Sequence, residues 1–337
     1  MEKILFLAHT ETDGRLPKAA LEVFTVAKGL AKSMAGSELF AGIIGRDGAT
    51  ASPDGVAKAF AVSGADFSVP RYGTDAAAAE ALCRAAGASI VVAPATSRLC
   101  RVMAGVAARL GAKFDSHATA VSAGNGTVRV SRWFYRQRME GVISRSSRPW
   151  VILVEPGVAE ASAAAAVGGA EEVGVSVTQA AKATEVTGIS APSAGEQTIR
   201  PDAGLLFVAG AGWTKKQADG RTHADRAAVL ILDFLKKSQA SLGGSKSVVD
   251  ISGEGQAVLP FMTHLNQIGQ TGSTPRHPKG LATCCHGEEP HTVGWRFVNA
   301  RRAVNTDPNC GWAQGKADVL YVADAFEVMA KVSALLE

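Results

Sequence analysis

Short apolar segments of strand length alternate with longer, alanine-rich segments through the first 110 residues of the chain. The apolar segments occupy residues 4–8, 39–44 and 90–93. The segments between them have the apolar spacing of amphipathic helices and occupy residues 18–33, 76–86 and 98–110. Strands that alternate with helices pair in parallel and are covered by helices. The pattern therefore predicts an α/β fold built on a parallel sheet.

The length of 337 residues exceeds what one hydrophobic core usually holds, so we expect two domains. Residues 127–154 are rich in β-branched and aromatic residues and predict further strands. Residues 158–200 are rich in small residues and predict a connector with one strand near 173–177. A second α/β unit follows, and we place the two domains at residues 1–197 and 198–337. The elements expected in the second domain are a strand at 204–210, a helix at 224–242, strands at 248–249, 281–284, 303–304 and 319–322, and a helix at 325–336.

Basic and acidic residues nearly balance, with 35 of the first kind, 31 of the second and a net charge of +4. The sequence has no dense Lys/Arg run of the kind that binds nucleic-acid phosphates, so nucleic acid is not an expected partner. Arginines gather in the middle of the first half, which predicts either ion pairs on a solvated face or a surface for an acidic partner. These arginines are Arg98, Arg101, Arg109, Arg129, Arg132, Arg136, Arg138, Arg145 and Arg148.

The apolar segment at residues 4–8 is too short for a signal-peptide core, and the other apolar runs are too short to span a membrane. We therefore expect a cytoplasmic protein that is not embedded in a membrane. The five cysteines are irregularly spaced and odd in number, which predicts free thiols rather than a disulfide framework.

Four glycine-bearing or polar turns mark the second half, at residues 209–213, 243–250, 268–272 and 284–291. Open α/β sheets bind ligands at the carboxyl ends of their strands, so turns at these places are candidates for ligand contacts. Plain tight turns explain the same residues equally well, and Gly243 with Gly244 also suits the end of a helix.

Two cysteines and two histidines fall within residues 284–291, which raises the question of a metal site. Adjacent cysteines are poorly placed to bind one tetrahedral ion, and no Cys-x-x-Cys pair accompanies them. We therefore expect no metal.

The order and spacing of these turns resemble the FAD domain of electron transfer flavoprotein α subunits. The segments that carry the resemblance are Gly-Ser-Lys before Val-Val-Asp at 244–250, Gly-Gln-Thr-Gly at 269–272, Asn-Thr-Asp-Pro at 305–308, and the closing strand and helix at 317–329. The first half is similar to the same family at residues 16–30, 101–115, 133–140 and 150–157. The resemblance implies an N-terminal nucleotide-binding-like domain, similar to the adenine nucleotide alpha hydrolases, and a C-terminal doubly wound FAD-binding domain.

The resemblance also implies a set of FAD-binding residues. They are Ser245, Lys246, Gln270, Thr271, Gly272, His286, Gly287, His291, Asn305 and Asp324. Lys246 stands where the family has an arginine over the flavin, and it keeps the positive charge without the planar fork. Gln270 and Thr271 match a pair whose hydroxyl bonds the ring near N5, and His291 matches a histidine beside N1 and the C2 carbonyl.

Two segments depart from the family pattern. Glu288 and Glu289 stand near the expected pyrophosphate position, where carboxylates oppose phosphate. Gly212 and Trp213 occupy the region where the family has an arginine in a Gly-Gly-Arg-Gly turn. These departures support an alternative, in which the chain is a nucleotide-binding or scaffold subunit that keeps the fold and has lost the flavin.

The main expectation from the resemblance is an electron carrier rather than an enzyme that converts a substrate. It implies a heterodimer with an electron transfer flavoprotein β subunit, which carries AMP or a second FAD. Electrons would come from flavin dehydrogenases that act on acyl-CoA or N-methyl amines, and would pass to a quinone oxidoreductase or another acceptor.

Overall fold

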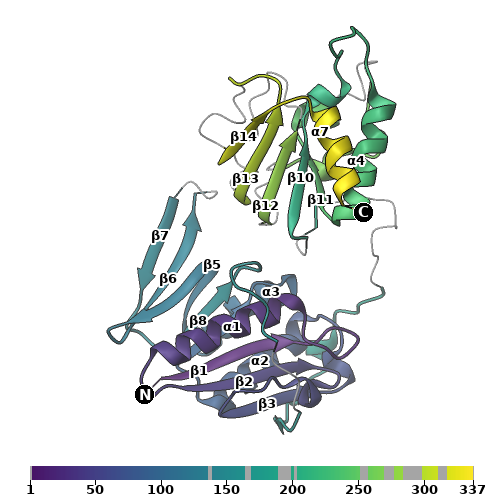
Figure 1. Cartoon of the computed structure of the whole chain (residues 1–337). Coiled ribbons are helices and arrows are strands. Elements are labelled where there is room, and N and C mark those ends of the chain that lie inside the picture. Colours follow the sequence, from purple (N-terminus) through teal and green to yellow (C-terminus); the bar gives the residue numbers. More distant parts are fainter. Residues whose placement is uncertain are drawn as a thin grey trace. The chain divides into compact units, whose positions relative to one another are not determined.

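The computed structural model describes residues 2–135, 139–163, 168–188, 199–200, 203–250, 257–268, 277–283, 298–309 and 317–336. The chain divides into two compact units, Met1–Ser190 and Ala191–Glu337. Each unit is a sheet with helices packed on it, which confirms the predicted α/β class (Figure 1). No helix in the described ranges has the length and apolarity needed to cross a membrane.

The first unit is built on a nine-stranded sheet with the order β7-β6-β5-β8-β4-β1-β2-β3-β9. Its strands are β1 (Lys3–His9), β2 (Glu38–Gly45), β3 (Lys58–Ser63), β4 (Ile90–Pro94), β5 (Lys113–Gly124), β6 (Thr127–Phe134), β7 (Met139–Ser144), β8 (Trp150–Val154) and β9 (Glu171–Glu172). β1 pairs in parallel with both β2 and β4, so the chain reverses its direction of winding between β1 and β4. β5, β6 and β7 form an antiparallel arm at one side of the sheet.

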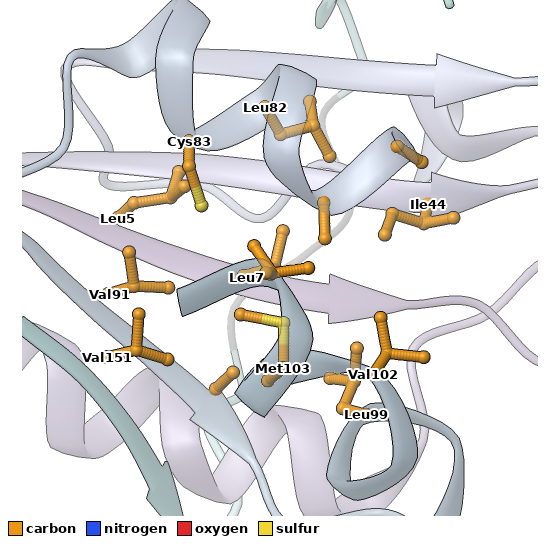
Figure 2. Close-up of a cluster of buried hydrophobic side chains, with 14 of the residues drawn as sticks. Leu5, Leu7, Ile44, Leu82, Cys83, Val91, Leu99, Val102, Met103 and Val151 are labelled. Atoms are coloured by element: carbon orange, nitrogen blue, oxygen red, sulfur yellow. The ribbon is translucent and has the colours of Figure 1, made fainter. Parts of the chain in front are cut away.

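Helices cover both faces of this sheet: α1 (Lys18–Ser33) lies on one face, and α2 (Tyr72–Ala86) and α3 (Ser97–Arg109) lie on the other. Alternate residues of β1 therefore enter different cores. Ile4 and Phe6 pack with α1, and the rings of Phe6 and Phe24 lie 5.0 Å apart. Leu5 and Leu7 join the side chains of α2 and α3 (Figure 2). Short 3₁₀ helices occupy Gly48–Ala51, Ala65–Phe67 and Ala180–Lys182.

The elements predicted for the first unit agree best with the structure at the strands that are buried on both faces of the sheet. The strands expected at 4–8, 39–44 and 90–93 are β1, β2 and β4, and the helix expected at 18–33 is α1. The prediction of a strand near 173–177 is wrong. The segment that pairs with β3 is β9, which begins two residues earlier. β3 and β5 were not predicted.

The second unit is built on five parallel strands with the order β11-β10-β12-β13-β14. They are β10 (Leu205–Ala209), β11 (Ser241–Gly244), β12 (His277–Thr283), β13 (Val298–Asn305) and β14 (Val319–Val322). The described helices are α4 (Ala224–Ser238), α5 (Lys246–Asp250) and α7 (Ala325–Leu335), with 3₁₀ turns at Ala211–Thr214 and His264–Asn266. α4 and α7 pack together over one face of the sheet. This strand order is doubly wound, with its switch point between β10 and β12.

Two predictions about the second unit are wrong. The helix expected at 224–242 ends at Ser238, because Gln239 adopts a left-handed conformation with φ of 54°, and β11 follows. The strand expected at 248–249 is part of α5. Val248 and Val249 favour a strand by propensity, but both are buried in the core of this unit, and tertiary packing overrides that preference.

Gly243 and Gly244 are strand residues rather than the helix end that their sequence context suggested. A Cβ atom on Gly243 would lie 2.6 Å from Cγ2 of Ile268 and 3.2 Å from Cδ1 of Leu206. Glycine is therefore required here for close packing.

Candidate functional site

The carboxyl edge of the second sheet collects one polar or glycine residue from each of its five strands. Because all five strands run in parallel, Gly210, Ser245, Thr283, Asn305 and Asp324 lie at or just beyond the same edge. The pairings of Ala209 with Gly244 and with Thr283 fix the register of the first three strands. This is the edge at which open α/β sheets bind ligands.

Ser245 and Lys246 form the junction between β11 and α5. The Ser245 amide donates to the Ala209 carbonyl at 3.0 Å, which ties the junction to β10. The Ser245 hydroxyl accepts from the Val248 amide at 3.3 Å and so caps α5. Lys246 is exposed at this edge. The charged Lys246 side chain therefore starts at the carboxyl edge, and two hydrogen bonds of Ser245 hold the backbone in place there.

The segment before Gly-Gln-Thr-Gly runs beside β11. The Ile268 amide donates to the Gly244 carbonyl at 3.1 Å, and Gln267 forms a parallel bridge with Gly244. The Asn266 side chain donates to the Leu242 carbonyl at 3.3 Å. Three predicted site residues that follow lie outside the described residues; they are Gln270, Thr271 and Gly272.

Asn305 is the last residue of β13, and Asp324 follows the end of the neighbouring strand β14. Asn305 is buried and pairs with Val322, and its carbonyl accepts from the Ala323 amide at 3.0 Å. One carboxylate oxygen of Asp324 accepts from the Phe326 amide at 2.8 Å and caps α7. Asp324 therefore stabilises the start of α7 and also lies at the carboxyl edge of the sheet.

The switch point of the second sheet is filled by Trp213. The indole is fully buried, donates from Nε1 to the Thr283 hydroxyl at 2.9 Å, and packs on Phe326 with ring centroids 4.6 Å apart. The Thr283 hydroxyl in turn donates to the Val208 carbonyl at 3.2 Å. Trp213 thus serves the core rather than a ligand surface. No sequence motif marks Thr283, since its role depends on the pairing of β10 with β12.

The remaining predicted site residues, His286, Gly287 and His291, lie outside the described residues, as do Glu288 and Glu289. Within the described ranges, no three His, Cys, Asp or Glu side chains lie close enough to share a metal ion. Cys83 and Cys100 are free thiols, and burial raises the pKa of Cys83 to about 12. The other three cysteines belong to segments that are not described.

The arginine cluster of the first unit is held largely by ion pairs. Arg98 pairs with Asp75, Arg148 with Glu2, and Arg109 with Glu80. Arg132 and Arg145 share Asp115. Of the two interpretations of this cluster, internal ion pairing therefore accounts for these five arginines. Arg136 and Arg138 lie outside the described residues.

Two α/β units, each with a topological switch point, define the general class of this protein as one of the doubly wound folds that bind nucleotides and related ligands. The sequence matches the family model of the electron transfer flavoprotein domain over residues 4–203. That match spans more than half of the chain, so the chain belongs to the electron transfer flavoprotein family. A search of curated proteins found no match. The family match ends where the second sheet begins, so the carboxyl edge of that sheet is interpreted from its own residues.

Proposed function

We propose that this chain is the FAD-binding α subunit of a heterodimeric electron transfer flavoprotein, with residues 198–337 as its flavin domain. The observation that carries the proposal is the gathering of Ser245, Lys246, Asn305 and Asp324 at one edge of a parallel sheet. The resemblance to the family implies these four residues, and they come from three different strand ends. The membership of the family supports the same conclusion.

The donor set fits a flavin dinucleotide chemically. A carboxylate such as Asp324 can accept from ribose hydroxyls, and the Asn305 amide can both donate and accept. Lys246 offers a positive charge to a phosphate or to the ring system. FAD supplies one- and two-electron redox chemistry when it is bound, and the protein supplies position and electrostatics.

Lys246 is the residue that we expect to tune the redox potential. Reduction places negative charge on the flavin ring, and a nearby cation favours that charge. The predicted role of Gln270, Thr271 and His291 is to donate hydrogen bonds around the ring.

The proposed partner is a β subunit that carries AMP or a second FAD. Flavin dehydrogenases of the acyl-CoA or N-methyl amine type are the proposed electron donors, and a quinone oxidoreductase or another acceptor receives the electrons. The chain is then a carrier, and it has no bond-making catalytic residue of its own.

The test is purification of the chain together with its β subunit, followed by a visible spectrum and a redox titration. The Lys246→Ala variant should lower the flavin potential by tens of millivolts, because it removes a unit charge near the ring. Lys246→Arg should retain the potential. Lys236→Ala is the matched control, since Lys236 is an exposed lysine in the last turn of α4. An unchanged potential in Lys246→Ala would show that Lys246 does not face the ring.

The alternative is a subunit that keeps the fold without the flavin. Trp213 favours it, because the indole is buried beneath the switch point where the family pattern has an arginine. A colourless heterodimer that takes up no added FAD would establish this alternative and end the carrier proposal.

A further inference from the structure

Residues 168–188 of the connector lie along the surface of the first unit, and we call this segment the strap. None of its residues is buried. Its first part contains β9, which pairs with β3 over two residues, and the Val173 amide then donates to the Ala61 carbonyl at 2.7 Å. Its second part contains the 3₁₀ helix at Ala180–Lys182, which lies on α2. The strap therefore runs over the surface from β3 to α2.

Two ion pairs join the strap to the body of the first unit. Lys58 pairs with Glu171 at 2.5 Å, and Asp66 pairs with Lys182 at 2.5 Å. All four side chains are between 35% and 58% exposed. Ion pairs that are this exposed stabilise a structure only slightly, and salt weakens them further. The charged contacts therefore hold the strap loosely.

Three valines supply the apolar contacts of the strap. Val173, Val175 and Val177 pack on the core beneath α2 and α3, and all three remain half-buried. The stabilisation from apolar contacts grows with the area that they remove from water, so half-buried valines contribute only part of what a core valine does. The strap is thus docked by contacts that are specific and individually weak.

Gly73, the second residue of α2, is the point at which the strap comes closest to the helix. A Cβ atom on Gly73 would lie 2.6 Å from the carbonyl oxygen of Ala181 and 2.7 Å from its Cα. Both are backbone atoms, so no change of side-chain rotamer relieves the clash. Docking of the strap therefore requires glycine at this position.

Two glycines precede β9 at the other end of the strap. Gly168 and Gly169 both have a left-handed backbone, with φ of 65° and 75°. Glycine adopts this conformation without the steric cost that other residues have, and a pair of such residues lets a chain change direction. Hinges in proteins consist of a few residues of this kind.

We propose that the strap docks on the first unit and releases from it as one piece, with Gly168 and Gly169 as its hinge. Docking then sets the length of the tether that joins the two units. This inference goes beyond the proposed flavin site and does not depend on it, because all the docking contacts lie in the first unit.

The two lengths of the tether follow from the hydrogen bonds at its ends. With the strap docked, the chain is held as far as Thr184, whose carbonyl accepts from Nε of Arg71 at 2.9 Å. The second unit is bonded from Arg200, whose amide donates to the Ser241 hydroxyl at 2.6 Å. The tether of residues 185–199 then spans at most about 55 Å. With the strap released, the nearest earlier hydrogen bond among the described residues is that of the Ser162 amide to a carbonyl of α1. The tether of residues 163–199 then spans at most about 130 Å.

The test of docking is amide hydrogen exchange of the full-length chain, followed by mass spectrometry of peptides from the strap and from β1. Gly73→Ala should speed exchange of the Val173 amide about tenfold, because the added methyl group prevents the strap from seating. Exchange of β1 should not change. Gly29→Ala is the matched control, since Gly29 is a glycine of α1 with nothing within 4 Å of the added carbon. Equal exchange of the strap in the two variants would overturn the proposal.

A second variant tests docking without a change in a helix. The double substitution Lys58→Gln and Lys182→Gln removes both ion pairs, so it should speed exchange of the strap at low ionic strength and have less effect at high ionic strength. Lys32→Gln is the control, since Lys32 is an exposed lysine of α1 for which the described residues provide no ion pair. Exchange of the strap that is independent of salt in the unmodified chain would also overturn the proposal.

Small-angle X-ray scattering of the full-length chain measures the tether. Gly73→Ala should increase the radius of gyration and the maximum dimension, whereas Gly29→Ala should leave both unchanged. Faster exchange of the strap with unchanged scattering would show that the strap does not set the tether length. The flavin proposal is judged by the visible spectrum of the heterodimer, so failure of one proposal is distinguishable from failure of the other.

Discussion

Asp115 on β5 is the buried charge that organises the arginine-rich part of the first unit. Its carboxylate accepts from Arg145 at 2.6 and 3.0 Å, from the Trp150 indole at 2.9 Å and from Arg132 at 3.3 Å. Burial alone would raise the pKa of Asp115, but the hydrogen bonds from Arg145 and Trp150 outweigh it and hold the pKa below its ordinary value. One carboxylate thus links β5 to β6 and β8.

The Asp115→Ala variant should lower the free energy of unfolding by about 3 kcal/mol, because it leaves partly buried arginines and an indole without their acceptor. Urea unfolding at pH 7 measures the loss. Because the folded pKa lies below the unfolded one, the stabilisation is present at neutral pH and disappears as the pH falls through the folded pKa. Glu140→Ala is the control, since the exposed Glu140 accepts from Thr119 alone among the residues that the structure describes. Equal losses in the two variants would contradict the role of Asp115.

Two histidines of the first unit should titrate on opposite sides of the ordinary value of 6.5. Burial, aided by Arg98, lowers the pKa of His9, whereas the hydrogen bond that His117 donates to the Glu155 carboxylate raises the pKa of His117. The unfolded state therefore binds a proton more readily at position 9, so His9 reduces stability as the pH falls below about 6.5. His117 contributes stability that is present below 6.5 and is lost as the pH rises through its folded pKa. Nitrogen-detected NMR titration of the two rings measures both values, and coincident midpoints would refute the prediction.

At the scale of elements, β11 and its neighbours show how close packing replaces local propensity. Helix α4, strand β11 and helix α5 follow one another within 27 residues, and β11 has only four residues. Its two glycines allow Ile268 and Met262 to approach the backbone. The Ser245–Lys246 junction is therefore positioned by the side chains of Met262 and Ile268, which follow Ser245 by 17 and 23 residues.

Gly243→Ala should destabilise the protein by about 1–3 kcal/mol, because the added methyl group meets Cγ2 of Ile268. Gly29→Ala is the matched substitution in α1, where nothing lies within 4 Å of the added carbon. It should stabilise the protein by about 0.5–1 kcal/mol through helix propensity. Thermal unfolding of both variants measures the difference, and the same sign for both would refute this account of β11.

The sequence is sufficient to predict elements whose buried residues are continuous or regularly spaced. β1, β2 and β4 are almost entirely buried, so their apolar runs are continuous, and α1 has one buried face with helical spacing. β5 was missed because only some of its residues are buried, so its 12 residues give no apolar run. β11 was missed because two of its four residues are glycines.

The candidate sites were predictable only where a motif marks them. Ser245, Asn305 and Asp324 belong to recognisable segments, and parallel strands bring them to one edge. His9 is an ordinary residue in the sequence. Its contact with the Thr96 hydroxyl comes from the pairing of β1 with β4, which brings the two residues together across 87 positions.

At the scale of the whole molecule, the two units have separate hydrophobic cores. The family match covers the first unit almost completely, whereas the proposed flavin residues lie in the second. The family membership, which rests on the first unit, and the proposed flavin site in the second unit can therefore be tested separately.

A fragment of residues 1–190 should fold by itself, because its core is complete within that range. It should remain colourless after incubation with FAD, whereas the full-length chain with its β subunit should be yellow. Circular dichroism and the visible spectrum measure these outcomes. A yellow fragment would place the flavin in the first unit and would contradict the proposed location.

The two-residue strand β9 has a consequence for the behaviour of the protein at high concentration. Its two glutamates pair with β3, where Glu171 forms an ion pair with Lys58 at 2.5 Å and Glu172 accepts from the Ser63 hydroxyl at 2.6 Å. An uncovered β3 would present open amides and carbonyls beside an apolar strand, which is a template for edge-to-edge association of copies. A very short acidic strand occupies these groups and repels a second copy of itself. We therefore expect the connector to limit edge-to-edge association at β3, in addition to joining two units.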